Sequence, residues 1–155
     1  MEIPATLPLA DGNALPGKAV DGNVKATNLS VHGEKEITMP LIELDASCEV
    51  ADAGKRQQLA GALSRVVAEG TGKPEQYVMA CVRDKVAMAM SGQAGPSALV
   101  TVKAIGGLTK TVNQSLAGKI CQMLQKELAI PADRVYITFQ ELAASNWAWN
   151  GKTFG

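Results

Sequence analysis

Two stretches of the chain decide its fold. Residues 59–82 read LAGALSRVVAEGTGKPEQYVMACV, and residues 116–139 read LAGKICQMLQKELAIPADRVYITF. The second stretch repeats the pattern of the first at a constant offset of 57 residues. The equivalent pairs are Leu59 and Leu116, Leu63 and Ile120, Val66 and Met123, Val67 and Leu124, Pro74 and Pro131, Val78 and Val135, and Val82 and Phe139. Two tandem copies therefore nearly fill residues 40–155.

Each copy has the pattern of a strand, a helix and a second strand. Short apolar-rich runs of strand length occupy residues 41–48 and 98–105, and the closing strands are expected at 77–82 and 135–140, each after a proline. Between them, apolar residues recur at helical spacing and form one face of an amphipathic helix in each copy. These stripes are Leu59, Ala62, Leu63, Val66 and Val67 in the first copy, and Leu116, Ile120, Met123, Leu124 and Leu128 in the second. We expect Gly70 to end the first helix.

The repeat predicts an α/β (α+β) fold of two tandem βαβ units related by a pseudo-two-fold axis. Its four strands form one sheet, and its two helices cover one face of that sheet. The other face needs a second cover, and its residues are interpreted as apolar enough for neighbouring subunits to supply it. Oligomerisation is therefore part of the predicted fold.

Composition excludes several classes of protein. The 155 residues carry 15 basic and 15 acidic groups, so there is no positive excess that would indicate a nucleic-acid partner. No run of 18 apolar residues occurs, which argues against a membrane partner. Three widely spaced cysteines, at 48, 81 and 121, favour buried thiols over a disulfide framework or a zinc site. We expect no metal and no cofactor.

The chain divides near residue 40. Residues 1–39 have three prolines, no aromatic residue, no sustained periodicity and the only histidine, His32, and we expect them to be a disordered extension that is tag-like or a leader. Residues 40–155 contain all six aromatic residues and form the folded domain. Since no secretory signal is visible at the start of the chain, the expected location is the cytosol.

Residues 39–155 contain five separated strings that are distinctive together: Met39-Pro40-Leu41-Ile42, Thr71-Gly72-Lys73-Pro74 with Tyr77, Ala104-Ile105-Gly106, Pro131-Ala132-Asp133-Arg134-Val135-Tyr136-Ile137, and Trp149-Asn150-Gly151-Lys152-Thr153-Phe154. In this order they resemble the macrophage migration inhibitory factor family of the tautomerase superfamily. The resemblance implies a homotrimer with phenylpyruvate or dopachrome tautomerase activity on a small aromatic 2-keto acid or its enol.

The resemblance also implies the catalytic residue. In this family an N-terminal proline, exposed after removal of the initiator methionine, is the general base, and that residue is Pro40 here. A terminal proline is a secondary amine, and an apolar pocket and a nearby lysine lower the pKa of such a group. Residues 40–155 contain no histidine, the commonest general base.

The substrate-binding residues follow from the same resemblance. Lys73 and the backbone N–H of Ile105 bind the substrate carboxylate. Tyr136 and Thr138 reach the pocket of a neighbouring subunit, although Thr138 stands where the family usually has asparagine. Lys103 stands where a histidine often lines the site, which adds positive charge and favours acidic substrates. The remaining lining residues are Leu41, Tyr77 and the aromatic cluster of Trp147, Trp149 and Phe154.

We expect Met39 to be the true initiator, with residues 1–38 either upstream sequence read through in frame or an artificial extension. Glu34-Lys35-Glu36 can be encoded by a purine-rich run resembling a ribosome-binding site two codons before Met39. If residues 1–39 stay attached, the nitrogen of Pro40 is an amide and cannot act as a base. A non-catalytic trimer that binds a protein receptor, as cytokine members do, and a structural trimer with a vestigial pocket remain the alternatives. Secretion by a leaderless route also stays open.

Overall fold

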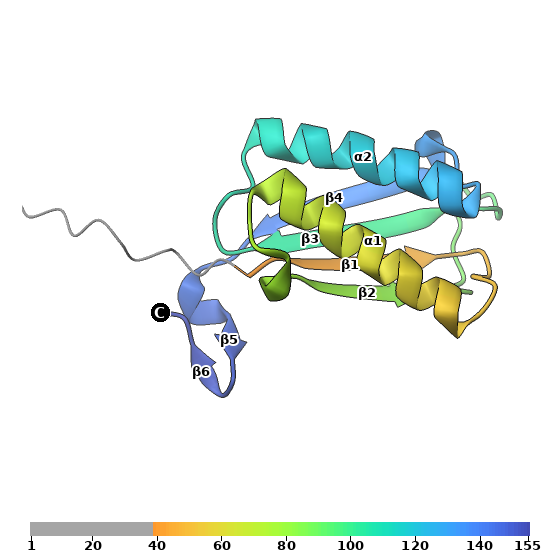
Figure 1. Ribbon diagram of the computed structural model, residues 1–155. Coiled ribbons are helices and arrows are strands. Elements are labelled where there is room, and N and C mark those ends of the chain that lie inside the picture. The colour runs from red at the N-terminus through yellow and green to blue at the C-terminus, as the bar shows by residue number, and fades with distance from the viewer. Residues whose placement is uncertain (1–38) are drawn as a thin grey trace, which may run out of the picture. The chain divides into compact units, whose positions relative to one another are not determined.

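The computed structural model describes residues 39–155. The extension expected over residues 1–39, with His32 and the predicted upstream sequence, lies outside the described residues except for Met39. Two long helices, four main strands and a short C-terminal hairpin make up the described part of the chain (Figure 1). Their bounds are β1 (Leu41–Ala46), α1 (Ala53–Thr71), β2 (Met79–Arg83), β3 (Ala98–Ala104), α2 (Lys110–Leu128), β4 (Val135–Glu141), β5 (Ala148–Trp149) and β6 (Lys152–Thr153), with 3-10 turns at η1 (Glu75–Tyr77), η2 (Ala132–Arg134) and η3 (Ala144–Asn146).

The four main strands form one mixed sheet in the order β2-β1-β3-β4. Strands β1 and β2 are parallel, β3 and β4 are parallel, and the two pairs meet where β1 runs antiparallel to β3. Both helices lie on one side of this sheet (Figure 1). The predicted pair of βαβ units and the coverage of one sheet face are therefore confirmed.

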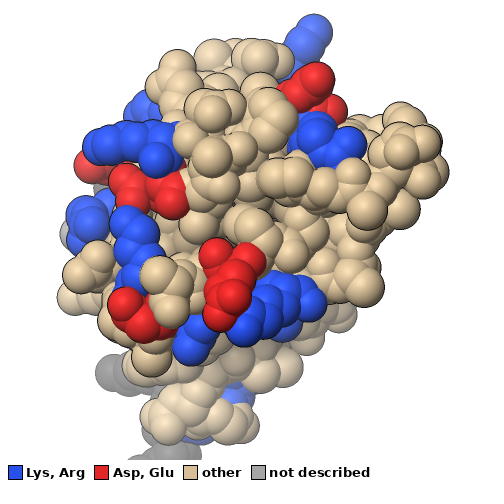
Figure 2. All heavy atoms as spheres, turned by 90° about the vertical axis from the view of Figure 1, so that its right-hand side faces the viewer, with Lys and Arg blue, Asp and Glu red and all other residues tan. Residues whose placement is uncertain are grey.

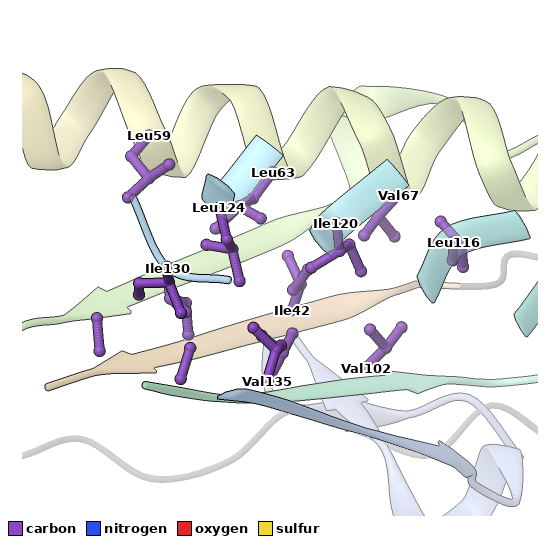
Figure 3. Close-up of a cluster of buried hydrophobic side chains, with 14 of the residues drawn as sticks. Ile42, Leu59, Leu63, Val67, Val102, Leu116, Ile120, Leu124, Ile130 and Val135 are labelled. Carbon is purple, nitrogen blue, oxygen red and sulfur yellow. The ribbon is translucent and has the colours of Figure 1, made fainter. Parts of the chain in front are cut away.

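The core fills the space between the helices and the sheet. Along β1 the residues alternate between half-buried and buried, and Ile42, Leu44 and Ala46 point toward the helices. Figure 3 shows the apolar stripes of the two helices directed at these strand residues. The fully buried members of both stripes are Leu59, Leu63, Val67, Leu116, Ile120 and Leu124. Each such side chain contributes about 1.5–3 kcal/mol of transfer free energy to folding.

The predicted end of the first helix is wrong by two residues. Helix α1 begins after Asp52, whose carboxylate accepts a hydrogen bond from the backbone N–H of Lys55. It continues through Gly70 and ends at Gly72, which has the left-handed φ of 69°. Gly70 serves a different purpose, because its missing side chain makes room for Leu116 of α2.

The open face of the sheet is also different from the prediction. The residues that face away from the helices on β1 are Leu41, Glu43 and Asp45, and on β3 they are Leu99, Thr101 and Lys103. The interpretation of this face as apolar is therefore wrong. Charged and hydroxyl side chains occupy its centre, while the large exposed apolar groups, Met79, Leu99 and Tyr136, lie toward its margins.

Candidate active site

Pro40 lies at one edge of the sheet, immediately before β1. It is buried, and its carbonyl oxygen accepts a hydrogen bond of 3.0 Å from the backbone N–H of Met79 in β2. The next residue, Leu41, pairs with Met79 on one side and with Lys103 of β3 on the other. Since β3 is antiparallel to β1, the beginning of β1 meets the end of β3 at this edge. Pro40 therefore lies where two strands start and a third one ends.

Lys73 reaches the same edge from the end of α1. After the left-handed turn at Gly72, the backbone N–H of Lys73 donates to the carbonyl of Ala68 at 3.0 Å. A Cβ atom on Gly107 would lie 3.5 Å from the Lys73 Cε and 3.7 Å from its Nζ. The ammonium group therefore lies against the turn that begins with Ile105 after β3. The structure brings Lys73 and the Ile105 segment together, as the resemblance implies.

Tyr77 and the C-terminal aromatic residues belong to segments that adjoin this edge as well. Tyr77 is the last residue of η1, and only Val78 separates it from the start of β2. Beyond β4, the backbone N–H of Leu142 donates to Ala104 at the end of β3, and the hairpin of β5 and β6 projects from there (Figure 1). Within this segment the Phe154 N–H donates to the Trp147 carbonyl at 3.1 Å, and Trp149 remains 59% exposed.

Tyr136 and Thr138 lie elsewhere on the sheet. Tyr136 pairs with Leu99 at the opposite end of β3 from Lys103, and Thr138 pairs with Thr101 in the middle. Leu99 and Lys103 are four residues apart, which separates Tyr136 from the Pro40 edge by about 13 Å along the strands. One chain therefore does not bring Tyr136 to Pro40.

Tyr136 instead contributes to a cavity away from the Pro40 edge. This cavity of about 300 Å³ lies beside the start of β4 and is lined by Met88, Ala89, Met90, Ser91, Ser97, Ala98, Leu99, Arg134 and Tyr136. The Arg134 guanidinium is held there by the carbonyls of Pro96 and Gln93 at 2.7 and 3.2 Å. The hydroxyl of Thr138 donates a hydrogen bond of 3.2 Å to the Thr101 hydroxyl on the open face.

Glu43 is the residue of this region that sequence reasoning does not single out. Its carboxylate accepts a hydrogen bond of 2.9 Å from the Lys103 Nζ. It also forms a longer ion pair with Arg83 at 3.4 Å. The Lys103 hydrogen bond, with a smaller contribution from Arg83, lowers the pKa of Glu43 below its ordinary value. The positive charge expected from Lys103 is therefore paired. The alternation in the string LIELDA at 41–46 is the signal that could have placed Glu43 on the open face.

Residues 39–155 contain no group of three or more His, Cys, Asp and Glu residues placed to hold a metal ion. None of the helices in this part of the chain has both the length and the apolar character to cross a membrane. Cys48, Cys81 and Cys121 are free and half-buried rather than fully buried, and desolvation raises the pKa of Cys48 and Cys121. On the face shown in Figure 2, basic and acidic side chains lie beside one another instead of in separate patches.

The matching family model is that of macrophage migration inhibitory factor, and it covers residues 39–155. A macrophage migration inhibitory factor homolog from Brugia malayi is 45% identical over 92 residues, which are 59% of this chain and 80% of that protein. The macrophage migration inhibitory factor of Xenopus tropicalis is 35% identical over the same shares of the two chains.

Solved structures agree with the family match. The macrophage migration inhibitory factor homologue from Prochlorococcus marinus has a TM-score of 0.69 and 41% identity, with 74% of this chain covering 99% of that one. The Toxoplasma gondii protein has the same TM-score and coverage at 28% identity. The matched region thus corresponds to nearly the whole solved chain of these two relatives. This chain belongs to the macrophage migration inhibitory factor family, within the tautomerase superfamily.

Proposed function

We propose that this protein is a keto–enol tautomerase of the phenylpyruvate or dopachrome type, with the nitrogen of Pro40 as its general base. The observation that carries the proposal is the placement of a buried Pro40 at the sheet edge to which Lys73 and the Ile105 turn also belong. Family membership supports a tautomerase at the level of the superfamily. The substrate, the base and the trimer are our inferences.

The chemistry of a secondary amine suits this reaction. An unperturbed α-amino group has a pKa of about 7.7–8.0. Burial and the positive charge of Lys73 both disfavour the protonated form, so the amine of a terminal Pro40 is largely unprotonated at neutral pH. It takes a proton from the carbon next to the keto group and returns it to the other end of the keto–enol system. Residues 40–155 offer no histidine for this purpose.

Lys73 and the backbone N–H of Ile105 are proposed to hold the substrate carboxylate. The Lys73 ammonium already lies against the turn that follows Ile105, so a carboxylate bound there can accept hydrogen bonds from both. The aromatic ring of the substrate then packs against the C-terminal residues Trp147, Trp149 and Phe154. Leu41 and Tyr77, which flank the same edge, complete the lining.

The proposed site is completed in a homotrimer. Tyr136 and Thr138 are about 7–13 Å along the sheet from the Pro40 edge of their own chain. A neighbouring subunit that packs against the open face can present these two side chains to the pocket instead. The exposed apolar groups at the margins of that face give such a neighbour surface to bury.

The test compares two forms of the protein. In the 155-residue chain Met39 precedes Pro40, so the proline nitrogen is an amide without a basic lone pair. The chain that starts at Pro40 should tautomerise phenylpyruvate, the full chain should be nearly inactive, and Pro40→Gly in the short form should lose most of the rate. Equal activity of the full and short forms would contradict the amine base.

The peptide bond between Met39 and Pro40 also favours a second candidate, a trimer that binds a protein receptor without catalysis. This candidate predicts that both forms of the chain are inactive on phenylpyruvate and on dopachrome, although both are folded and trimeric. The same comparison of rates therefore separates the two functions.

A further inference from the structure

An ion-paired network of four residues crosses the open face of the sheet. Arg83 of β2 contacts Asp45 and Glu43 of β1, and Glu43 in turn accepts a hydrogen bond from Lys103 of β3 at 2.9 Å. Their side chains are only partly buried, with exposed fractions between 22% and 49%. The two carboxylates differ in their partners, because Asp45 binds Arg83 alone while Glu43 also binds Lys103.

Lys103 is the member of this network that is nearest to the proposed site. It pairs directly with Leu41, the residue after Pro40, whereas Glu43 lies two residues further along β1. With strands about 4.8 Å apart and a rise of about 3.3 Å per residue, the Lys103 backbone lies within about 6 Å of Pro40, and Glu43 lies about 10 Å away. The Lys103 side chain extends toward Glu43 and thus away from the Pro40 edge.

We propose that Glu43 determines the charge selectivity of the Pro40 site by holding the Lys103 ammonium on the open face, where an acidic substrate does not meet it. This inference rests on the proposed tautomerase. Lys73 is then the lysine that binds the substrate carboxylate. Lys103 is a second cation, and its ion pair with Glu43 neutralises its charge. The pair acts through electrostatics, so Glu43 is a specificity-determining residue and not a catalytic one.

The charged groups around Glu43 and Lys103 support these different roles of the two lysines. Glu43 is the one ion-pair partner that residues 39–155 provide for Lys103, and Asp45 already satisfies Arg83. The pKa of Glu43 is lowered, so its carboxylate is ionised at neutral pH and the pair with Lys103 persists. The other titratable or charged groups of the neighbouring elements are Lys73 after α1, Tyr77 of η1, Cys81 and Arg83 of β2, Asp45 of β1, and Glu141 of β4.

The main test uses Glu43→Gln in the chain that starts at Pro40, the region that corresponds to nearly the whole solved chain of the Prochlorococcus marinus relative. The readout is kcat/KM for phenylpyruvate divided by kcat/KM for its methyl ester. Releasing the Lys103 charge should raise this acid-to-ester ratio about threefold, through KM rather than kcat. High salt should reduce the gain, because mobile ions screen the interaction between the two charges.

Two variants serve as controls. Asp45→Asn removes a carboxylate of the same network, strand and face that does not bind Lys103, so the ratio should stay unchanged. Glu43→Gln combined with Lys103→Gln should return the ratio to the original value. Lys103→Gln alone removes the lysine partner of Glu43, so the negative charge of Glu43 should lower the ratio. This variant also tests the proposal if Glu43→Gln does not fold. Equal ratios in all of these variants would overturn the proposal.

A second measurement is independent of turnover. The pKa of the Pro40 amine can be followed by the nitrogen-15 shift of a labelled proline, and Glu43→Gln should lower it by roughly 0.4, since an uncompensated Lys103 disfavours the protonated amine. Asp45→Asn should change it by less. If the short chain is inactive, the proposed function fails, yet this titration still decides the coupling between Glu43 and Pro40. An unchanged amine pKa would refute that coupling.

Discussion

Gly70 of α1 and Leu116 of α2 approach so closely that a Cβ atom at position 70 would lie 2.3 Å from the Leu116 Cδ2. No real Cβ contact is that short, so any side chain at this position displaces the leucine or separates the helices. Leu116 is fully buried and belongs to the stripe that faces the sheet. The two repeats are therefore joined at a point where one helix has no side chain and the other has a large one.

Gly70→Ala should destabilise the protein by about 1–3 kcal/mol, because the added methyl group overpacks against Leu116. The higher helix propensity of alanine, about 1 kcal/mol, offsets only part of this loss. Denaturant unfolding measures the difference. Gly118→Ala in α2 is the matched control, since no atom lies within 4 Å of its Cβ position, and it should be stabilising. A stabilised Gly70→Ala variant would contradict the close approach.

The protein should sediment as a trimer at micromolar concentration, with the open sheet face at the subunit contact. Two helices cover only one face, and Met79, Leu99 and Tyr136 on the other are between 40% and 68% exposed. Leu99→Asp places a charge among these apolar groups and should shift the equilibrium toward the monomer. Sedimentation equilibrium measures both states. A stable monomer of the unchanged protein would rule out the shared site.

Lys73→Ala should weaken the binding of carboxylate substrates by about one to two decades, while the corresponding methyl esters are affected much less. A hydrogen bond between an ammonium and a carboxylate contributes roughly 1.5–3 kcal/mol. Competition by the acid and the ester against turnover gives the two affinities. Lys119→Ala, which removes an exposed lysine of α2, should leave both unchanged. Equal losses for acid and ester would show that Lys73 is only a turn residue.

The stabilisation that Glu43 contributes should depend on pH with a defined sign. Its pKa is lowered from 4.5 in the folded state by Lys103, so the folded state binds protons less readily than the unfolded one. The contribution is therefore present above pH 4.5 and is lost as the pH falls through the lowered value. Wild type should exceed Glu43→Gln by no more than about 1 kcal/mol at pH 7.

The difference should vanish in strong acid, where the protonated Glu43 resembles glutamine. Free energies of unfolding of both proteins from pH 7 to pH 2, obtained with denaturant, provide the comparison. A difference between the two proteins that is constant over this range would show that Glu43 acts through packing and not through its charge.

Local patterns predicted most of the secondary structure. The period of about 3.6 in residues 59–67 and 116–128 and the short apolar runs around them depend only on which side of an element must be buried. The structure confirms the strands and helices within a few residues of the expected bounds. The end of α1 was missed because Gly70 and Gly72 both follow the apolar stripe, and only the packing of Leu116 separates their roles.

The repeat, the two helical stripes and the family can be read from the amino-acid order, because they depend on the spacing of neighbouring residues. Which side chains meet depends on how the chain folds back on itself. The pairing of Glu43 with Lys103 depends on the register between β1 and β3, and the contact of Lys73 with the Gly107 turn depends on two loops that approach across the sheet edge. Such contacts join residues tens of positions apart, so no local pattern encodes them, and their distances follow only from how the strands align.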